Sequence, residues 1–276
     1  MENKKIIMLK HHVLNVYYDN SFYTNQLDSG DRIEDYVVID VTSRMTRNKE
    51  FMAEHPNFAK EISPFYIGPV VSSDGVKANI FEVFWQCGKV YPCHDDNGHP
   101  NKAYFEWRNS FYAKTKCTKD LMRHACHDLG YENKDALYFA YYDKEKQEYV
   151  PLNYVQARKK VFVPEYAKLV ANSESFRYLK SIVDSGKKLA LVDFDAYNYY
   201  SRNAMRKAFE AYVNKLEKNN LRSKKTVWDF FRIDSMKKVM DCSYLTMGHG
   251  FVLKALLQGD LKVENGQVVD VSHILD

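Results

Sequence analysis

The segment FEVFWQCGKVY at residues 81–91 contains three polar side chains that could act in catalysis or binding: Glu82, Gln86 and Lys89. At about 100° per residue, a helix places them within about 60° of one another. The other residues of the segment are mostly apolar or small, the reverse of an ordinary surface helix, whose polar face is wide. The pattern therefore predicts a buried helix that keeps a carboxylate, an amide and an ammonium in a single file.

Periodicity alone leaves two interpretations of this file open. In one, Glu82 and Lys89 form a buried ion pair while Gln86 satisfies a backbone group. Such pairs are poor stabilisers, because the cost of desolvation can exceed the Coulombic gain. In the other interpretation the file lines a cleft, and apolar surroundings raise the pKa of the Glu82 carboxyl, as they do in catalytic acids and bases.

A second segment, LALVDFDAYNYY at residues 189–200, places carboxylates at the end of a buried strand. Open α/β sheets collect ligands at such strand ends. Asp195 is the candidate for chemistry here, and Asn198 is a candidate for substrate binding. The alternative is structural: Asp195 caps the following turn and Asn198 binds the backbone.

A third segment, MGHGFVLKALL at residues 247–257, sets Gly248 and Gly250 around His249 at the expected start of a helix. Backbone N–H groups exposed at a helix start favour phosphate or carboxylate. Close packing of the helix against its neighbours would explain the same two glycines, so both interpretations stay open.

Several other chemistries lack their signatures. The cysteines and histidines between residues 93 and 127 form no CxxC, HExxH or HxE…PCxxC pattern, and no metal is expected. The phosphate-binding GxxxxGK and dinucleotide-binding GxGxxG motifs are absent, and no cofactor is expected. The basic groups ARKK (157–160) and RSKK (222–225) are typical of a solvated face, or of contact with nucleic acid phosphates.

Composition allows a large core in a chain of 276 residues that is 45% hydrophobic. A net charge of +4 is compatible with nucleic acid or with anionic nucleotides. Five cysteines without a disulfide spacing, no leader of signal-peptide length and no apolar run near the roughly 20 residues of a spanning helix predict a cytoplasmic protein without a membrane partner.

The expected fold class is α+β: a compact, mostly helical single domain over residues 1–276 with a few short strands. No repeat or Pro/Gly/Ser-rich linker divides the chain. Strands are expected at 36–44 and 187–195, and an ordered loop at 61–70. Helices are expected at 80–91, 103–116, 118–130, 153–170 (interrupted at Pro164), 202–220 and 247–259.

Taken in order, these segments resemble the NADAR family of NAD- and ADP-ribose-associated proteins. The resemblance rests on four pieces between about residues 60 and 260, within a NADAR-like core of approximately residues 36–260: ISPFYIG, EVFWQCGK (Glu82, Trp85, Gln86, Lys89), LVDFDAYNYY and GHGFVLKALL. There are departures: Ser63-Pro64-Phe65 stands where the family has Ser-Asn-Phe, tyrosines replace a tryptophan–glycine near the acid, and His249 replaces a more usual asparagine. The chain thus looks like a divergent branch.

The resemblance implies a compact, mostly helical α+β fold and hydrolysis of an N-glycosidic bond between a ribosyl group and a base or amine. Glu82 would stabilise the positive charge on the sugar ring, with Asp195 as the second catalytic candidate. Phosphate would be held by the remaining charged groups and by the backbone of the glycine turn, namely Lys89, Arg44, His249, Gly248 and Gly250. The other candidate substrate contacts are Ser63, Phe65, Tyr66, Trp85, Gln86 and Asn198, with the aromatic members stacking on base or adenine.

Three hypotheses about function follow. The first is an N-glycosidase that removes ADP-ribose from a modified nucleobase in DNA or RNA, reversing ADP-ribosylation by a toxin or defence enzyme. The second is a glycosidase of a free phosphoribosylated nucleotide or pathway intermediate. The third is a protein that binds NAD or ADP-ribose without catalysis, or a helical interaction protein.

Overall fold

A computed structural model of the chain describes residues 6–10, 27, 30–42, 49–116, 125–193 and 247–276. The chain divides into two compact units. The first comprises Met1–Ser63, Val163–Met205 and Ser243–Asp276, and the second comprises Pro64–Phe162 and Arg206–Cys242. A single domain over residues 1–276 stays a prediction.

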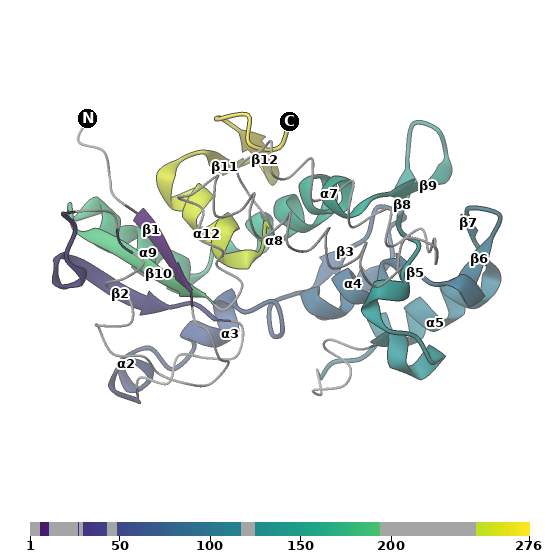
Figure 1. Cartoon of the computed structure of the whole chain (residues 1–276), viewed down its shortest axis with the longest axis horizontal. Coiled ribbons are helices and arrows are strands. Elements are labelled where there is room, and N and C mark those ends of the chain that lie inside the picture. Colours follow the sequence, from purple (N-terminus) through teal and green to yellow (C-terminus); the bar gives the residue numbers. More distant parts are fainter. Residues whose placement is uncertain (1–5, 11–26, 28–29, 43–48, 117–124, 194–246) are drawn as a thin grey trace, which may run out of the picture. The chain divides into compact units, whose positions relative to one another are not determined.

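The first unit is built on a parallel three-stranded sheet. Strand β10 (Lys188–Asp193) lies in the centre, between β1 (Ile6–Lys10) and β2 (Tyr36–Asp40) (Figure 1). A continuous apolar run makes up most of β10, as expected for the central strand of a parallel sheet that is covered on both faces. In register, Asp193 lies opposite Lys10 of β1. The two strands predicted at 36–44 and 187–195 are therefore present: β2 ends at Asp40, and β10 begins at Lys188 and is described as far as Asp193.

Helices and a hairpin complete the first unit. Helix α12 packs against β1, β10 and α8, and α9 packs against β10 and α3. Ser173 begins α9 in the usual way, by accepting a hydrogen bond from the N–H of Phe176. The elements are η1 (Ile33–Asp35), α2 (Lys49–Glu54), α3 (Phe58–Ile62), α8 (Val163–Val170), α9 (Glu174–Asp184), α12 (His249–Gln258), β11 (Leu261–Glu264) and β12 (Gln267–Asp270).

The second unit combines two helices with an antiparallel sheet in the order β5-β8-β9. Its main elements are α4 (Phe81–Cys87), α5 (Lys102–Tyr112), β5 (Lys89–Val90), β8 (Tyr138–Asp143) and β9 (Glu148–Leu152). Short hairpins and turns connect them: β3 (Val70–Val71), β4 (Lys77–Ala78), η2 (Pro92–His94), β6 (Asp95–Asp96), β7 (His99–Pro100), η3 (Ala125–Leu129), η4 (Asn133–Asp135), α7 (Tyr154–Ala157) and the π-helical η5 (Arg158–Phe162).

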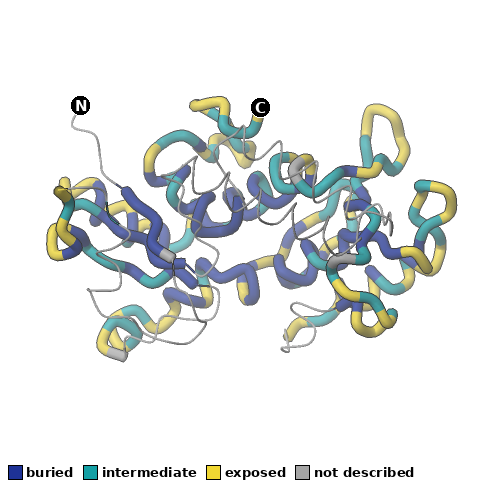
Figure 2. Tube along the Cα trace, in the orientation of Figure 1, coloured by how far each residue is buried: buried dark blue, intermediate teal, exposed yellow. Residues whose placement is uncertain are grey.

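Helix α4 is buried along nearly its whole length, as its composition predicts (Figure 2). Only Gln86 of its seven residues is not classed as buried. Two tyrosines of α5 contact the end of α4: Tyr112 donates a hydrogen bond to the carbonyl of Phe84, and Tyr104 donates one to the carbonyl of Gly88. These bonds help to satisfy carbonyl groups that a helix end leaves without intrahelical partners.

The mixture of helices and short strands confirms the mixed character predicted from the sequence. Four helix predictions need correction. The helix predicted at 80–91 ends at Cys87, the helix predicted at 103–116 ends at Tyr112, and a 3₁₀ turn (Ala125–Leu129) replaces the described part of the helix predicted at 118–130. Pro164 does not interrupt the segment 153–170, because it lies in the first turn of α8, where proline is tolerated. The helix predicted at 202–220 lies outside the described residues. Among the described helices, none has the length and apolar character needed to cross a membrane.

Candidate functional site

The loop that precedes α4 is anchored to the first turn of that helix. The N–H of Phe81 donates to the carbonyl of Ile67 at 2.9 Å, and the N–H of Glu82 donates to the carbonyl of Pro64 at 2.8 Å. Helix starts leave such N–H groups without intrahelical acceptors, and here the loop carbonyls supply them. The ISPFYIG loop and the EVFWQCGK helix therefore meet at the residue that carries the carboxylate.

The three polar side chains of the file form one hydrogen-bonded relay. Gln86 Nε2 donates to Glu82 Oε1 at 2.7 Å, and Lys89 Nζ donates to Gln86 Oε1 at 2.6 Å. Lys89 Nζ also donates to Asn133 Oδ1 at 3.1 Å. Glu82 and Lys89 are 8% and 7% exposed. Gln86 thus bridges the two charges, in place of the direct Glu82–Lys89 pair that one interpretation of the sequence predicts.

Lys89 reaches the relay from a strand and not from the helix. The chain leaves α4 at Gly88, and Lys89 pairs with Phe139 in the β5–β8 ladder. A Cβ atom on Gly88 would lie 2.2 Å from the Phe139 ring, so only glycine allows this approach. The polar stripe predicted for one continuous helix is therefore formed by a helix and the strand that follows it.

Burial makes Lys89 an unusually weak base. Desolvation is the main reason that its pKa is lowered from 10.5 to about 8; the attraction of the Glu82 carboxylate opposes this shift, and the positive charge of Arg158 adds to it. The thiols of Cys126 and Cys87 act in the opposite direction, because a thiolate would favour the ammonium. Lys89 consequently changes charge close to physiological pH, as groups at functional sites often do.

Several aromatic residues lie close in sequence to the relay residues, and most of them are buried. Trp85 is 3% exposed and stacks on Phe139 with ring centroids 5.1 Å apart, and the guanidinium carbon of Arg158 lies 4.4 Å from the centroid of the Trp85 ring. Phe65 is also buried, whereas Tyr66 is 51% exposed. Of the three aromatics predicted to stack on a ligand, Tyr66 presents the most surface to solvent. Stacking by any of them stays a prediction.

A second cluster lies within the first unit, at the end of β10. His249 Nε2 lies 2.6 Å from the carbonyl oxygen of Val41, and its Nδ1 lies 3.6 Å from Asp193 Oδ2. Asp193 and His249 are each 3% exposed. Both ring nitrogens of His249 therefore face oxygen atoms, and the imidazole holds the start of α12 against the ends of β2 and β10.

Gly250 is expected to be essential to this contact. A Cβ atom there would lie 2.7 Å from Asp193 Oδ2 and 2.7 Å from the Met8 methyl group. The methionine side chain is flexible, whereas Asp193 is the last residue of the buried strand β10 and its carboxylate is buried beside His249. We expect Gly250→Ala to lower the free energy of unfolding by about 1–2 kcal/mol, because the steric cost exceeds the gain of about 1 kcal/mol in helix propensity.

Urea denaturation measures this effect, and Ser181→Ala on the exposed surface of α9 is the control. The control should change stability by less than about 0.5 kcal/mol. A Gly250→Ala protein that is as stable as the wild type would show that the glycine is not needed for packing.

The remaining predicted residues are placed as follows. Ser63 is fully buried in the first unit, at the end of α3, where its N–H donates to the carbonyl of Ala59. Gly248 is the N-cap residue of α12. Three predicted residues lie outside the described part of the chain: Arg44, Asp195 and Asn198.

The predicted site residues thus fall into two clusters, one in each unit. Glu82, Trp85, Gln86 and Lys89 come together in the second unit, and His249 and Gly250 meet Asp193 in the first. A joint site in which Lys89 and His249 bind the same phosphate stays a prediction.

Three residues of the second unit enter the site without having been predicted. Asn133 accepts from Lys89, while Tyr154 accepts a 2.9 Å hydrogen bond from Arg158 Nε. The ARKK group gave a partial signal for Arg158, as a candidate for phosphate contact. Asn133 lies 44 positions from Lys89 in the sequence, and no local pattern connects the two.

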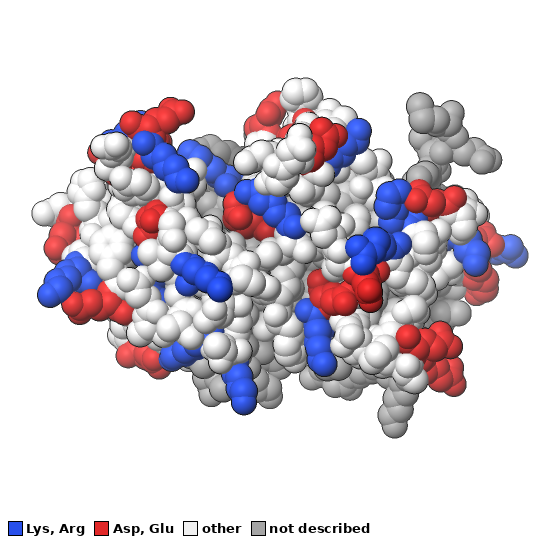
Figure 3. All heavy atoms as spheres, turned by 180° about the vertical axis from the view of Figure 1, so that it is seen from behind, with Lys and Arg blue, Asp and Glu red and all other residues white. Residues whose placement is uncertain are grey.

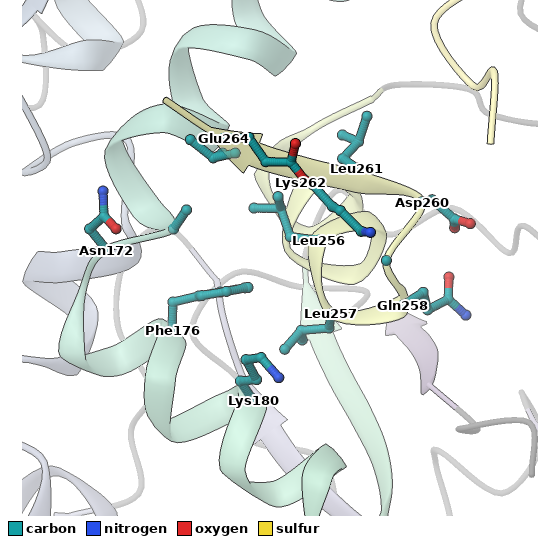
Figure 4. A pocket seen from close by; sticks show the side chains of 13 residues that line it. Asn172, Phe176, Lys180, Leu256, Leu257, Gln258, Asp260, Leu261, Lys262 and Glu264 are labelled. Atoms are coloured by element: carbon teal, nitrogen blue, oxygen red, sulfur yellow. The ribbon is translucent and has the colours of Figure 1, made fainter. Parts of the chain in front are cut away.

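A concave feature of the first unit is lined by none of the predicted site residues that the structure describes. It is an open groove of about 1010 Å³ between α9, the end of α12 and β11 (Figure 4). Phe176, Leu256 and Leu257 form part of its lining, and Lys180, which also lines it, donates a hydrogen bond to Asp184. Within the described residues, no group of three or more histidine, cysteine or acidic side chains could hold a metal ion.

Comparisons of the chain with models of protein families, with curated proteins and with solved structures found no match.

Proposed function

We propose that the protein is an N-glycosidase that hydrolyses a ribosyl–base C–N bond and removes ADP-ribose from a modified nucleobase in nucleic acid. The observation that carries the proposal is the relay from Glu82 through Gln86 to Lys89, built into an almost wholly apolar helix and the strand after it. Buried charges are expensive unless they are compensated, so a relay of this kind favours a functional role. The resemblance of this segment to the NADAR motif supports the same reaction.

Glu82 has the central role in the proposed mechanism. As the C–N bond breaks and the base leaves, positive charge builds on the sugar ring. A fixed carboxylate beside C1′ stabilises that charge and can orient or deprotonate the attacking water. The hydrogen bond from Gln86 holds one carboxylate oxygen, which limits the rotation of the Glu82 side chain.

Lys89 is proposed to bind phosphate as an ammonium ion. Its two amide acceptors, Gln86 and Asn133, carry no charge, so an anionic ligand could still neutralise it. Asp195 remains the second catalytic candidate, and Arg44, His249 and the amides around Gly248–Gly250 remain candidates for phosphate contact.

The charges on one face of the molecule bear on the choice between a nucleic acid and a free nucleotide as the substrate. On the face that Figure 3 displays, lysine and arginine side chains of the described residues are interspersed with acidic ones. Extended phosphate contact instead uses a basic stripe or patch. A free ADP-ribosylated nucleotide is accordingly the alternative substrate.

The proposal is tested by incubating the protein with ADP-ribosylated DNA, ADP-ribosylated RNA, free ADP-ribosylated nucleotides and NAD, and measuring released ADP-ribose. We expect release from a nucleic acid substrate. Release only from free nucleotides would favour the alternative substrate, and ligand-dependent stabilisation without any release would identify a binding protein.

Binding of a phosphorylated ligand should weaken above about pH 8, where Lys89 loses its proton. The affinity for ADP-ribose should fall by up to about tenfold per pH unit above that value, as expected when binding requires one protonated group. Isothermal titration calorimetry between pH 7 and pH 10 measures this profile. Lys89→Arg should flatten it, because arginine keeps its charge throughout.

Loss of the Lys89 proton does not destabilise the folded protein, so unfolding through this group cannot explain a loss of affinity at high pH. In the unfolded chain the lysine keeps its proton up to about 10.5, whereas in the folded protein it loses the proton near 8. Between these values the unfolded chain binds more protons, so this group makes the folded protein more stable as pH rises. An affinity that stays constant from pH 7 to pH 10 would exclude Lys89 from phosphate binding.

A further inference from the structure

Arg158 occupies an aromatic setting in the second unit. It is the first residue of the π-helical turn Arg158–Phe162, a rare element that often marks functional sites. Its guanidinium carbon lies 4.4 Å from the centroid of the Trp85 ring and 4.0 Å from that of Phe162. Its Nε donates to the hydroxyl of Tyr154 at 2.9 Å. These contacts restrict the movement of the guanidinium group beside Trp85, which precedes Gln86 of the relay in α4.

Arg158 and Lys89 are linked through the same pair of aromatic residues. Arg158 lies over Trp85, Trp85 stacks on Phe139, and Phe139 is the partner of Lys89 in the β5–β8 ladder. The charge of Arg158 lowers the pKa of Lys89, so the two cations repel each other. In the described part of the chain neither side chain lies within salt-bridge distance of a carboxylate; their polar contacts go to Gln86, Asn133 and Tyr154. Lys89 is buried and Arg158 is half-buried. A buried cation beside a second cation, with no direct anionic partner of either among the described residues, is costly, which favours a site that receives an anion.

We propose that Arg158 and Lys89 together form an anion site that binds the phosphate groups of a nucleotide ligand, with Arg158 as its specificity-determining residue. This inference rests on the proposed function, because it names the ligand chemistry of the same site. Arg158 uses Nε for Tyr154, and its two Nη groups can bind two phosphate oxygens at once. Lys89 contributes its third N–H. The ligand class is a nucleoside diphosphate carrying a sugar, and an unphosphorylated nucleoside lacks the groups that this site recognises.

The test compares ligand affinity in Arg158→Met, Arg158→Lys and the matched control Lys160→Met. Methionine keeps apolar contact with the aromatic rings and removes the charge together with the hydrogen bond to Tyr154. Lys160 is an exposed cation of the same π-helical turn. Calorimetry with ADP-ribose, inorganic pyrophosphate and adenosine gives the affinities, and the melting temperature without ligand shows whether each variant folds.

We expect Arg158→Met to weaken ADP-ribose binding at least tenfold, with only partial rescue by lysine, which cannot bind two oxygens in a plane. Pyrophosphate should bind the wild-type protein and lose affinity in the same variant, and adenosine should not bind measurably. Lys160→Met should leave all three results unchanged. Equal affinities of Arg158→Met and the wild type for ADP-ribose would overturn the proposal.

A second readout separates ligand binding from a merely structural role. Removing the positive charge of Arg158 should raise the pKa of Lys89, so the remaining ADP-ribose binding of Arg158→Met should persist to higher pH than in the wild type. An unchanged pH midpoint would contradict the coupling of the two cations.

Affinity is measured without turnover, so the anion site and the proposed reaction can fail separately. If no substrate is hydrolysed but binding depends on Arg158, the proposed reaction fails and the anion site stands. If substrate is hydrolysed but Arg158→Met leaves the affinity unchanged, the reaction stands and the anion site fails.

Discussion

Replacing Glu82 by glutamine is expected to lower the rate of ADP-ribose release by about 10²–10⁴-fold. The substitution removes the negative charge that faces the developing positive charge on the sugar. It keeps the side-chain shape and an oxygen that can accept the hydrogen bond from Gln86 Nε2. The free energy of unfolding should therefore change by less than about 1 kcal/mol. Single-turnover assays of ADP-ribose release, together with urea denaturation, measure the two quantities.

The assay of this variant needs a control for Lys89. The carboxylate of Glu82 raises the pKa of Lys89, so its loss lowers the pKa of the lysine further below about 8. Assays below neutral pH keep the lysine protonated and isolate the effect of the carboxylate. Glu145→Gln, at an exposed turn of the second unit, serves as the matched control and should retain full activity. Near-normal turnover by Glu82→Gln would remove this carboxylate from the mechanism.

The second large effect concerns stability. We expect Arg108→Ala to lower the free energy of unfolding by about 3–5 kcal/mol, because it leaves Asp74 buried without its cation. Arg108 Nη2 lies 2.7 Å from Asp74 Oδ2, and the two side chains are 4% and 13% exposed. Burial raises the pKa of Asp74, but hydrogen bonds from Ser72 and Tyr149 and the charge of Arg108 lower it more, so the net shift is downward.

Urea denaturation of four variants tests this pair: Arg108→Ala, Asp74→Ala, the double variant and Lys102→Ala. Lys102→Ala removes one partner of an exposed Lys102–Glu106 pair on the same helix, at 3.5 Å, and should cost less than about 0.5 kcal/mol. The double variant Arg108→Ala/Asp74→Ala should lose less stability than the sum of the two single variants, because no unpaired charge remains. Equal losses for Arg108→Ala and Lys102→Ala would show that the buried pair contributes no more than the exposed one.

The sequence pattern predicted secondary structure correctly where the residues of a single segment determine it. The apolar run of 187–195 predicts the central strand β10, and the nearly all-apolar sequence after residue 80 predicts the buried helix α4. The prediction failed at the end of that helix. Periodicity places Lys89 on the helix, but the Phe139 ring packs against Gly88, and the β5–β8 ladder takes Lys89 into a strand.

The contacts of the candidate site likewise include some that the sequence predicts and others that it does not. Glu82 and Gln86 lie one helical turn apart, so the contact between them follows from α-helical spacing. The partners that complete the site lie far away in the sequence: Asn133 beside Lys89, and Arg158 over Trp85. The sequence shows basic residues at 157–160, but a solvent-facing helix could carry the same residues, so the pattern does not place Arg158 at the site.

By itself the sequence determined which residues could carry charge into an apolar environment, because helical and strand periods are local properties of the chain. Only the tertiary structure decided that Gln86 joins Glu82 to Lys89 and that Arg158 lies over Trp85, and likewise that His249 meets Asp193. The physical reason is that desolvation and packing depend on all neighbours of a side chain, and most of these neighbours are brought close only by folding.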